Sequence, residues 1–209
     1  MYSRCRQQLW RCRYSLSMTS ALIIFVRNPV LGKVKTRIAA AIGDKNALAV
    51  YKHLLQHTKD ITGGLPVSRF VFYADEITTN DLWNGYEKCL QTGTDLGKRI
   101  SNAFEWLFEK GFSKIVIIGS DCLELDEKMI SDAFLKLNES EIVIGPATDG
   151  GYYLLGMQSP FKNLFENIIW SSGNVFTETL KQIQQKKLIV HLLPTLNDVD
   201  EAKDITFDY

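Results

Sequence analysis

The aspartate that follows a run of β-branched residues is the side chain best placed for chemistry. Residues 115–118 read I-V-I-I, which is typical of a strand buried on both faces of a parallel sheet. Asp121 lies just past the C-terminal end of that strand, where open α/β sheets bind ligands. Its carboxylate would suit Mg²⁺ or Mn²⁺. Asp121 could instead only cap the helix that begins near Glu127, although Asp126 fits that position better, and this stretch alone leaves both interpretations open.

A basic loop after the first apolar run is the second candidate. Residues 21–26 read A-L-I-I-F-V, which predicts a strand, and R-N-P-V-L-G-K-V-K-T-R follows. Lys33, Lys35 and Arg37 alternate with Val34 and Thr36, so an extended loop would place the three cations on one side. Cations and backbone N–H groups at a strand-to-helix loop can bind phosphate, although most such clusters are solvated loops. The helix after this loop should begin near residue 38, with Thr36 as its cap.

Two glycine-containing motifs follow further along the chain. In G-T-D-L-G-K-R, Asp95 is a good N-cap for an amphipathic helix, and Gly97 in the first turn would allow close approach of a ligand or of packed protein. In G-P-A-T-D-G-G-Y-Y-L-L-G, the turn Asp149-Gly150-Gly151 predicts either a shaped pocket wall or a plain hairpin.

Composition restricts the class of protein. The chain has 209 residues, 45% of them hydrophobic, and a formal net charge of zero. The length and apolar content predict one hydrophobic core. The zero net charge does not favour nonspecific electrostatic binding of nucleic acid. No apolar run approaches the ~20 residues of a membrane span. Four cysteines without a CxxC pair predict reduced thiols and a cytoplasmic location. The oligomeric state is not indicated.

The order of apolar patterns predicts the architecture. Runs of strand type alternate with helical patterns, which favours parallel pairs joined by right-handed crossovers. Strands are expected at residues 21–26, 68–74, 89–91, 115–118, 142–144, 152–155 and 188–193. Helices are expected at residues 38–42, 47–61, 96–108, 127–137, 161–165 and 175–183. Residues 1–18, basic at the start and without an acidic residue, read as a disordered or non-native leader to a single domain over 19–209.

The ordered set of motifs carries a resemblance. The set is F-V-R-N-P-V-L-G-K-V-K-T-R, D-L-G-K-R, I-G-S-D-C-L-E-L, G-P-A-T-D-G-G-Y-Y-L-L-G, I-I-W-S-S and D-V-D-E-A-K-D-I. Together these motifs resemble the bacterial glycosyltransferase-like DUF2064 family, of the nucleotide-diphospho-sugar transferase (GT-A) fold. That family is similar to 2-phospho-lactate guanylyltransferase and to sugar and molybdopterin nucleotidyltransferases. The resemblance implies an α/β fold of three layers (α/β/α) around a mixed, mostly parallel sheet.

The resemblance also assigns roles to residues of this chain, with Mg²⁺ or Mn²⁺ as the cofactor. The nucleotide-binding residues that it implies are Arg27, Gly32, Lys33, Lys35, Arg37, Asp95 and Gly97. The implied catalytic residues are Asp121, Lys35 and Arg37. The implied metal ligands are Asp121 and Asp200, and the implied acceptor-binding residues are Asp149, Gly150 and Gly151.

The expected activity is a metal-dependent transferase that acts on a nucleotide. Either nucleotidyl transfer to a small anionic acceptor or glycosyl transfer from a nucleotide-sugar would fit. Many sugar-transferring relatives carry D-x-D after the central strand, whereas Gly119-Ser120-Asp121 offers a single acid and is closer to the nucleotidyltransferase pattern. Leu123 stands where the family usually has proline. The alternative is a non-catalytic nucleotide-binding protein that retains the fold, which would have no need of both Asp121 and Asp200.

Overall fold

A seven-stranded mixed sheet forms the centre of the computed structural model, which describes residues 19–170 and 172–209. The strands lie in the order β3-β2-β1-β4-β6-β5-β7, and β6 runs antiparallel to both of its neighbours while every other pair is parallel. Their bounds are β1 (Ser20–Val26), β2 (Ser68–Tyr73), β3 (Glu87–Leu90), β4 (Lys114–Ile118), β5 (Ile142–Pro146), β6 (Tyr152–Met157) and β7 (Val190–Leu192). The predicted α/β fold with a mixed, mostly parallel sheet is confirmed.

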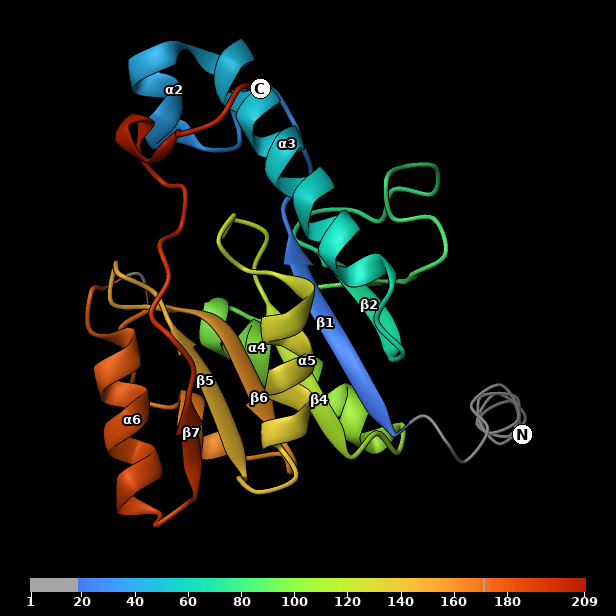
Figure 1. Cartoon of the computed structure of the whole chain (residues 1–209), viewed down its shortest axis with the longest axis vertical. Coiled ribbons are helices and arrows are strands. Elements are labelled where there is room, and N and C mark those ends of the chain that lie inside the picture. Colours follow the sequence, from blue (N-terminus) through green and yellow to red (C-terminus); the bar gives the residue numbers. More distant parts are fainter. Residues whose placement is uncertain (1–18, 171) are drawn as a thin grey trace.

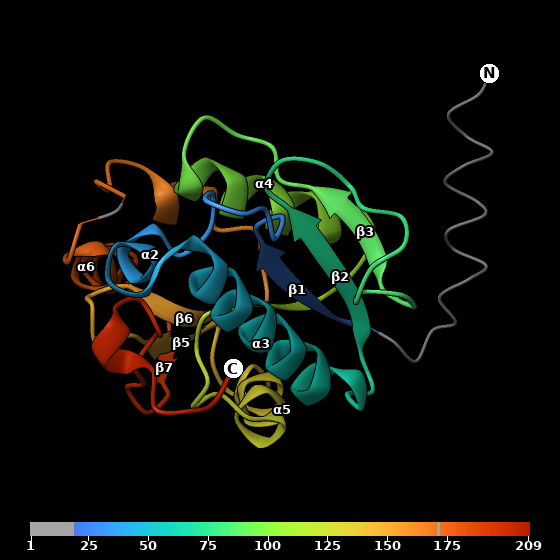
Figure 2. The same cartoon turned by 90° about the horizontal axis from the view of Figure 1, so that it is seen from above.

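Helices cover both faces of this sheet, which gives three layers (Figures 1 and 2). Helices α3 (Asp44–Gly63) and α5 (Glu127–Lys136) pack on one face, and α4 (Leu96–Glu109) and α6 (Val175–Gln185) on the other. Along β1, Leu22 and Ile24 face the first pair of helices and Ala21 and Ile23 face the second. This burial on both faces explains why the central strands are continuous apolar runs and do not alternate with polar residues.

A smaller apolar cluster lies beyond the end of the sheet. It joins α2 (Thr36–Ile42) to the N-terminal half of α3 and to the tail that contains the short helix η2 (Ala202–Asp204). Its buried residues are Ile38, Ala47, Val50, Leu54 and Val199. The red tail therefore crosses from the sheet to α2 at the top of Figure 1, and it carries the C-terminal acids to the loop that follows β1.

The helix caps agree with the sequence in two places and differ in a third. Asp95 accepts a hydrogen bond from the backbone N–H of Lys98 at 2.9 Å, and Asp126 accepts one from Met129 at 2.7 Å. Both aspartates are therefore N-caps, as predicted. The prediction that Thr36 caps α2 is wrong, because the helix already includes Thr36 and its N-cap is Lys35.

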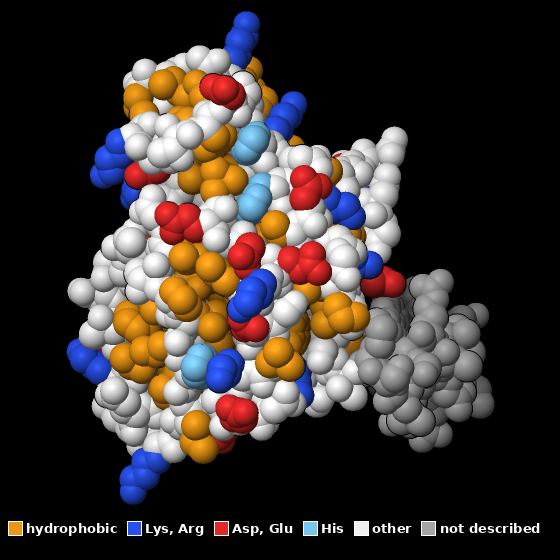
Figure 3. Space-filling view, viewed as in Figure 1, with side chains coloured by type: hydrophobic (Ala, Val, Ile, Leu, Met, Phe, Trp, Pro, Cys, Tyr) orange, Lys and Arg blue, Asp and Glu red, His pale blue; other side chains and the backbone are white. Residues whose placement is uncertain are grey.

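Smaller differences concern short elements. The helix expected at residues 161–165 is one 3₁₀ turn, η1 (Lys162–Phe165), and β7 is shorter than its apolar run. The leader predicted at residues 1–18 lies outside the described part of the chain. Within the described part, no helix combines the length and the apolar character needed to cross a membrane. Figure 3 shows acidic and basic side chains interspersed on one face of the molecule, without a broad field of one sign.

Candidate functional site

An ammonium group between two carboxylates marks the C-terminal edge of the central strands. Lys35 Nζ lies 3.0 Å from Asp121 Oδ1 and 3.0 Å from Asp200 Oδ1. The Lys35 side chain is only 7% exposed, whereas Asp121 and Asp200 are 43% and 37% exposed. The cation is thus buried beneath two acids that still face solvent, and the acids come from segments far apart in the sequence.

The backbone positions Lys35 by an uncommon conformation. Lys35 has φ 47° and ψ 48°, in the left-handed region, where a residue with a side chain is strained by roughly 1–3 kcal/mol. The preceding residue, Val34, is buried in the core. The carbonyl of Lys35 accepts the first helical hydrogen bond of α2, from the N–H of Ala39 at 2.8 Å. Such strain persists only where the surroundings determine it, and strained residues cluster at functional sites.

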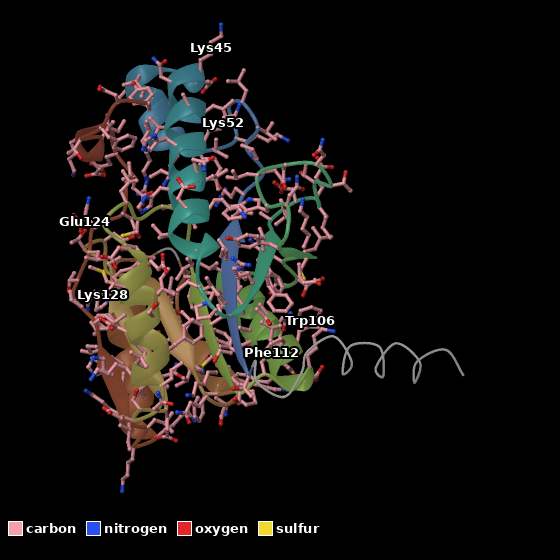
Figure 4. The ribbon with its side chains drawn as sticks, turned by 45° about the vertical axis from the view of Figure 1, so that its right-hand side comes forward. Lys45, Lys52, Trp106, Phe112, Glu124 and Lys128 are labelled. Carbon is pink, nitrogen blue, oxygen red and sulfur yellow. The ribbon has the colours of Figure 1, made fainter. Side chains whose placement is uncertain are left out.

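The C-terminal tail is fastened to the loop after β4. The backbone N–H of Val199 donates to the carbonyl of Asp121 at 2.9 Å, and that of Asn197 donates to Glu124 Oε2 at 3.0 Å. Figure 4 labels Glu124 on the stretch between β4 and α5. These two bonds place Asp200 beside Asp121.

The electrostatics of this centre are dominated by acids. Burial alone would lower the pKa of Lys35, but Asp121 and Asp200 outweigh burial and raise it, so the ammonium stays protonated. Asp198 is the opposite case: burial, followed by the negative charges of Asp121, Asp149 and Asp200, raises its pKa to about 7, and Lys35 opposes this. One lysine does not balance this group of carboxylates, so the centre has the charge to accept a further cation.

Asp198 was missed as a site residue by sequence reasoning. In N-D-V-D it reads as an acid before a short helix, which is a common and favourable arrangement. The alternation of Asp198 and Asp200 around the buried Val199 was the available signal, since alternate residues of an extended tail can face one site.

Tyr51 is a second residue that the sequence did not single out. Its hydroxyl accepts a hydrogen bond from the N–H of Arg27 at 2.8 Å, donates to the carbonyl of Arg27 at 3.1 Å, and lies 3.5 Å from Ser120 Oγ. Burial, with Asp121 adding to it, raises the pKa of Tyr51 to about 12. Because Arg27 follows β1 and Ser120 follows β4, this buried hydroxyl ties together the two loops that carry Lys35 and Asp121.

The basic loop is not extended. A turn spans residues 31–33, Gly32 has φ +74°, and Arg37 already belongs to α2. Lys35 alone of the three alternating cations contacts Asp121; Lys33 and Arg37 are exposed and pair with no described residue. An extended loop with three cations on one side is therefore not formed, and the phosphate-binding roles of Lys33 and Arg37 stay predictions.

Gly97 and Trp170 are in close contact. A Cβ atom at Gly97 would lie 2.1 Å from Cε2 of Trp170, so the space left by the glycine is filled by an indole from this chain. Trp170 also lies 6.3 Å from the ring of Phe165, centroid to centroid. Gly97 therefore allows the close packing of another part of this protein, which is one of the two uses predicted for it. The roles of Gly97 and Asp95 in nucleotide binding stay predictions.

The turn at residues 149–151 joins β5 and β6. Gly150 has φ +88°, and a Cβ atom there would lie 1.9 Å from the carbonyl oxygen of Gly173, so only glycine fits. Asp149 Oδ1 accepts a hydrogen bond from the N–H of Gly151 at 2.8 Å, and Asp149 is exposed. The turn of this hairpin thus packs against the backbone of Gly173. The negative charge of Asp149 contributes to the raised pKa of Asp198.

The centre fits a divalent cation in its donor chemistry. Asp121 and Asp200 present hard carboxylate oxygens to one point, and the Lys35 ammonium shows that a cation is stabilised there. Within residues 19–170 and 172–209, no set of three or more His, Cys, Asp or Glu side chains is already arranged as a metal site. Asp121 and Asp200 would therefore supply part of a coordination shell, and substrate oxygens or water the remainder, as Mg²⁺ sites commonly do.

The strand order of the sheet and the match to a solved structure show a nucleotide-diphospho-sugar transferase fold. The chain belongs to the DUF2064 family, described as an uncharacterized protein conserved in bacteria, whose profile matches residues 59–172. A "putative nucleotide-diphospho-sugar transferase" from Desulfovibrio desulfuricans G20 has a solved structure that is 30% identical, with a TM-score of 0.83, and the match covers 88% of this chain and 83% of that one.

More distant solved structures share the fold alone. The inositol-1-phosphate CTP transferase from T. maritima is 13% identical with a TM-score of 0.53, over 92% of this chain and 94% of that one. Glucosyl-3-phosphoglycerate synthase from Mycobacterium tuberculosis, solved with Mn²⁺, uridine-diphosphate and glucosyl-3-phosphoglycerate, is 9% identical with a TM-score of 0.52, over 94% and 75%. No curated protein matches the chain. The structural relatives thus include nucleotidyl- and glycosyltransferases.

Proposed function

We propose that this protein is a metal-dependent transferase acting on a nucleotide, with its centre at Lys35, Asp121 and Asp200. The observation that carries the proposal is the buried ammonium held 3.0 Å from each of two half-exposed carboxylates. The centre lies at the C-terminal ends of β1 and β4, which is where open α/β sheets bind ligands. The carboxylates around Lys35 outnumber it, which supports the binding of a metal cation at this centre. A bound metal cation would in turn attract the phosphate groups of a substrate.

In this proposal each residue has a distinct task. Asp121 and Asp200 would hold Mg²⁺ or Mn²⁺, which would supply positive charge to neutralise phosphate oxygens. Lys35, released from one carboxylate, contributes a positive charge close to the leaving group. Lys33 and Arg37 are two positions before and after Lys35, are exposed, and have no partner among the described residues. The guanidinium of Arg37 can donate two parallel hydrogen bonds to one phosphate.

Nucleotidyl transfer is the reaction that the site supports best. An oxygen of a small anionic acceptor attacks the α-phosphorus of a nucleoside triphosphate, the bond from that phosphorus to the bridging oxygen breaks, and pyrophosphate leaves with the electron pair. Gly119 favours this reaction, since the position two residues before Asp121, where D-x-D relatives carry an acid, has no carboxylate here. In glycosyl transfer, the second candidate, an acceptor oxygen forms a bond to the anomeric carbon of the sugar, the bond from that carbon to the diphosphate oxygen breaks, and a nucleoside diphosphate leaves with the electron pair.

The acceptor would approach from the turn that carries Asp149, Gly150 and Gly151. This turn follows the C-terminal end of β5. The negative charge of Asp149 in the turn helps to raise the pKa of Asp198. Asp149 is exposed and keeps one carboxylate oxygen beyond the bond to Gly151. It could therefore accept a hydrogen bond from an acceptor hydroxyl.

A ligand screen followed by product analysis tests the proposal. Nucleoside triphosphates and nucleotide-sugars, each with Mg²⁺ or Mn²⁺, should include one that raises the melting temperature of the wild type, because ligand bound at 100 times its Kd stabilises by ~2.7 kcal/mol. The matched Asp121→Asn variant should show no such shift.

Products then separate the reactions. Pyrophosphate release indicates nucleotidyl transfer, and nucleoside diphosphate release indicates glycosyl transfer. A shift without turnover for any acceptor would favour the non-catalytic nucleotide-binding protein. The absence of a shift with every nucleotide would overturn the proposal itself.

A further inference from the structure

We infer a second small-molecule site, between α3 and the loop that joins β2 to β3, for a small apolar molecule that carries an anionic group. A cavity of about 300 Å³ lies there, at the low end of the range of ligand pockets. Its lining residues are Val26, Arg27, Pro29, Lys52, Leu55, Gln56, Tyr73, Thr78, Asp81, Leu82 and Trp83. The site does not rest on the proposed transferase function.

The walls of this cavity are apolar and fixed. Leu55 and Trp83 are buried, at 4% and 2% exposure, and the Trp83 ring packs edge-on against Tyr86 with centroids 5.5 Å apart. The loop between β2 and β3, which covers the cavity, is also fixed to the segment after β1. The Asn28 side chain donates a hydrogen bond to the carbonyl of Glu76 at 2.9 Å. A cavity with ordered walls can bind a ligand without first paying to order them.

Asp81, the only acid among the described lining residues, has hydrogen-bond donors on both of its carboxylate oxygens. Asp81 Oδ1 accepts from Lys88 Nζ at 2.7 Å and from the N–H of Trp83 at 3.0 Å, while Oδ2 accepts from the hydroxyl of Tyr73 at 2.6 Å. Burial and the Asp81 carboxylate raise the pKa of Tyr73, which keeps that hydroxyl a donor. A cationic ligand would therefore find no free carboxylate here.

The two basic residues in the lining are, by contrast, available. The side chains of Arg27 and Lys52 form no hydrogen bond or ion pair with any residue in the described ranges. Figure 4 shows Lys52 on the upper half of α3, the helix that forms one wall. An apolar interior with unpaired cations at its edge is complementary to an organic anion such as an aryl or branched-chain carboxylate.

This cavity is distinct from the Lys35 centre. None of Lys35, Asp121 and Asp200 lines it, and the residues of α3 that do lie along one side of that helix. Between the two sites runs the backbone of Arg27, whose N–H and carbonyl are both bound to the hydroxyl of Tyr51. The two sites therefore share the loop after β1. Arg27, which the resemblance assigns to nucleotide binding, lines the cavity, and its role toward a nucleotide stays a prediction.

Three probes of one shape test the charge preference. Phenylacetate, neutral phenylacetamide and cationic 2-phenylethylamine would be titrated into the full chain, with binding followed by the amide signals of a ¹H–¹⁵N NMR spectrum. Phenylacetate should shift the signals of α3 and of residues 78–83, and it should bind most tightly of the three. Absence of binding by phenylacetate, or equal binding by all three probes, would overturn the inference.

Paired variants on one helix test the location. Lys52→Gln should weaken phenylacetate binding roughly three- to five-fold, the size expected for one partly exposed charge contact. Lys45→Gln removes an equal charge at the N-terminal end of α3, about two turns before Lys52 and outside the cavity lining, and should leave the affinity unchanged (Figure 4). Equal losses in both variants would show nonspecific attraction.

Competition separates this site from the nucleotide site. Saturating concentrations of the best nucleotide found, with Mg²⁺, should leave phenylacetate bound. If no nucleotide binds, inorganic pyrophosphate with Mg²⁺ serves as the competitor. Displacement by either would make the cavity part of the transferase centre and would overturn the claim of a separate site, whatever the fate of the proposed function.

Discussion

Replacing Asp198 by asparagine should remove a pH-dependent destabilisation that the fold carries at its site. Burial and the charges of Asp121, Asp149 and Asp200 raise the pKa of Asp198 from an ordinary 3.8 to about 7. One pKa unit corresponds to ~1.4 kcal/mol, so the full effect is about 4 kcal/mol. Neighbouring acids share the proton uptake, and the expected net effect is about 2–4 kcal/mol.

The sign follows from proton binding. Between about pH 4 and pH 7 the folded protein holds a proton on Asp198 that the unfolded chain has lost, so the free energy of unfolding falls as the pH rises through this window. Asparagine has nearly the same shape and no charge. Asp198→Asn should therefore exceed the wild type in stability by only about 1 kcal/mol near pH 4.5, and by the full net effect near pH 8.

Urea unfolding in EDTA, followed by tryptophan fluorescence between pH 4.5 and pH 8, measures this difference directly. The exposed Asp208, which has no partner among the described residues, supplies a matched control as Asp208→Asn. The control should follow the wild-type profile. Parallel profiles for Asp198→Asn and the wild type would refute the electrostatic account of this carboxyl group.

Three further outcomes are expected. Gly97→Ala should destabilise the protein by about 1–3 kcal/mol in urea unfolding, because its Cβ would overlap the Trp170 ring; unchanged stability would contradict this packing. Tyr51→Phe should lower the unfolding free energy by about 1–2 kcal/mol, since it leaves the Arg27 N–H without its partner, and equal stability would contradict that role. Arg37→Lys should weaken nucleotide binding in calorimetric titrations although Lys45→Ala does not, whereas equal affinities would mean that the basic loop is only solvated.

The fold was predictable because burial leaves a strong pattern. Strands covered on both faces read as unbroken apolar runs, and alternating helical patterns then require parallel crossovers. The position of Asp121 followed from the same logic, since a residue that leaves a central strand at its C-terminal end faces the crevice. The caps Asp95 and Asp126 were found because capping is decided within one helical turn.

The details of the site depend on contacts that local patterns do not contain. In the sequence, Lys35 is one of three equivalent cations. In the structure, the turn before Lys35 and the left-handed backbone conformation of Lys35 direct only this side chain toward Asp121. The raised pKa of Asp198 arises only once the tail docks through Val199 onto the loop after β4. Glycine is required at position 97 because the Trp170 ring packs against it. Trp170 is distant in the sequence, so no local spacing of residues predicts this contact.

Uptake of Mn²⁺ in the presence of nucleotide tests whether Asp121 and Asp200 together hold the metal of a transferase centre. The electron paramagnetic resonance signal of free Mn²⁺ would be titrated with wild type, Asp121→Asn, Asp200→Asn and the control Asp208→Asn, each with the nucleotide that gives the largest thermal shift. The wild type and the control should bind Mn²⁺, and both site variants should lose that binding while their melting temperatures without ligand stay close to the wild type. Equal Mn²⁺ uptake by all four proteins would contradict the assignment of Asp121 and Asp200, and the transferase centre would then lie elsewhere.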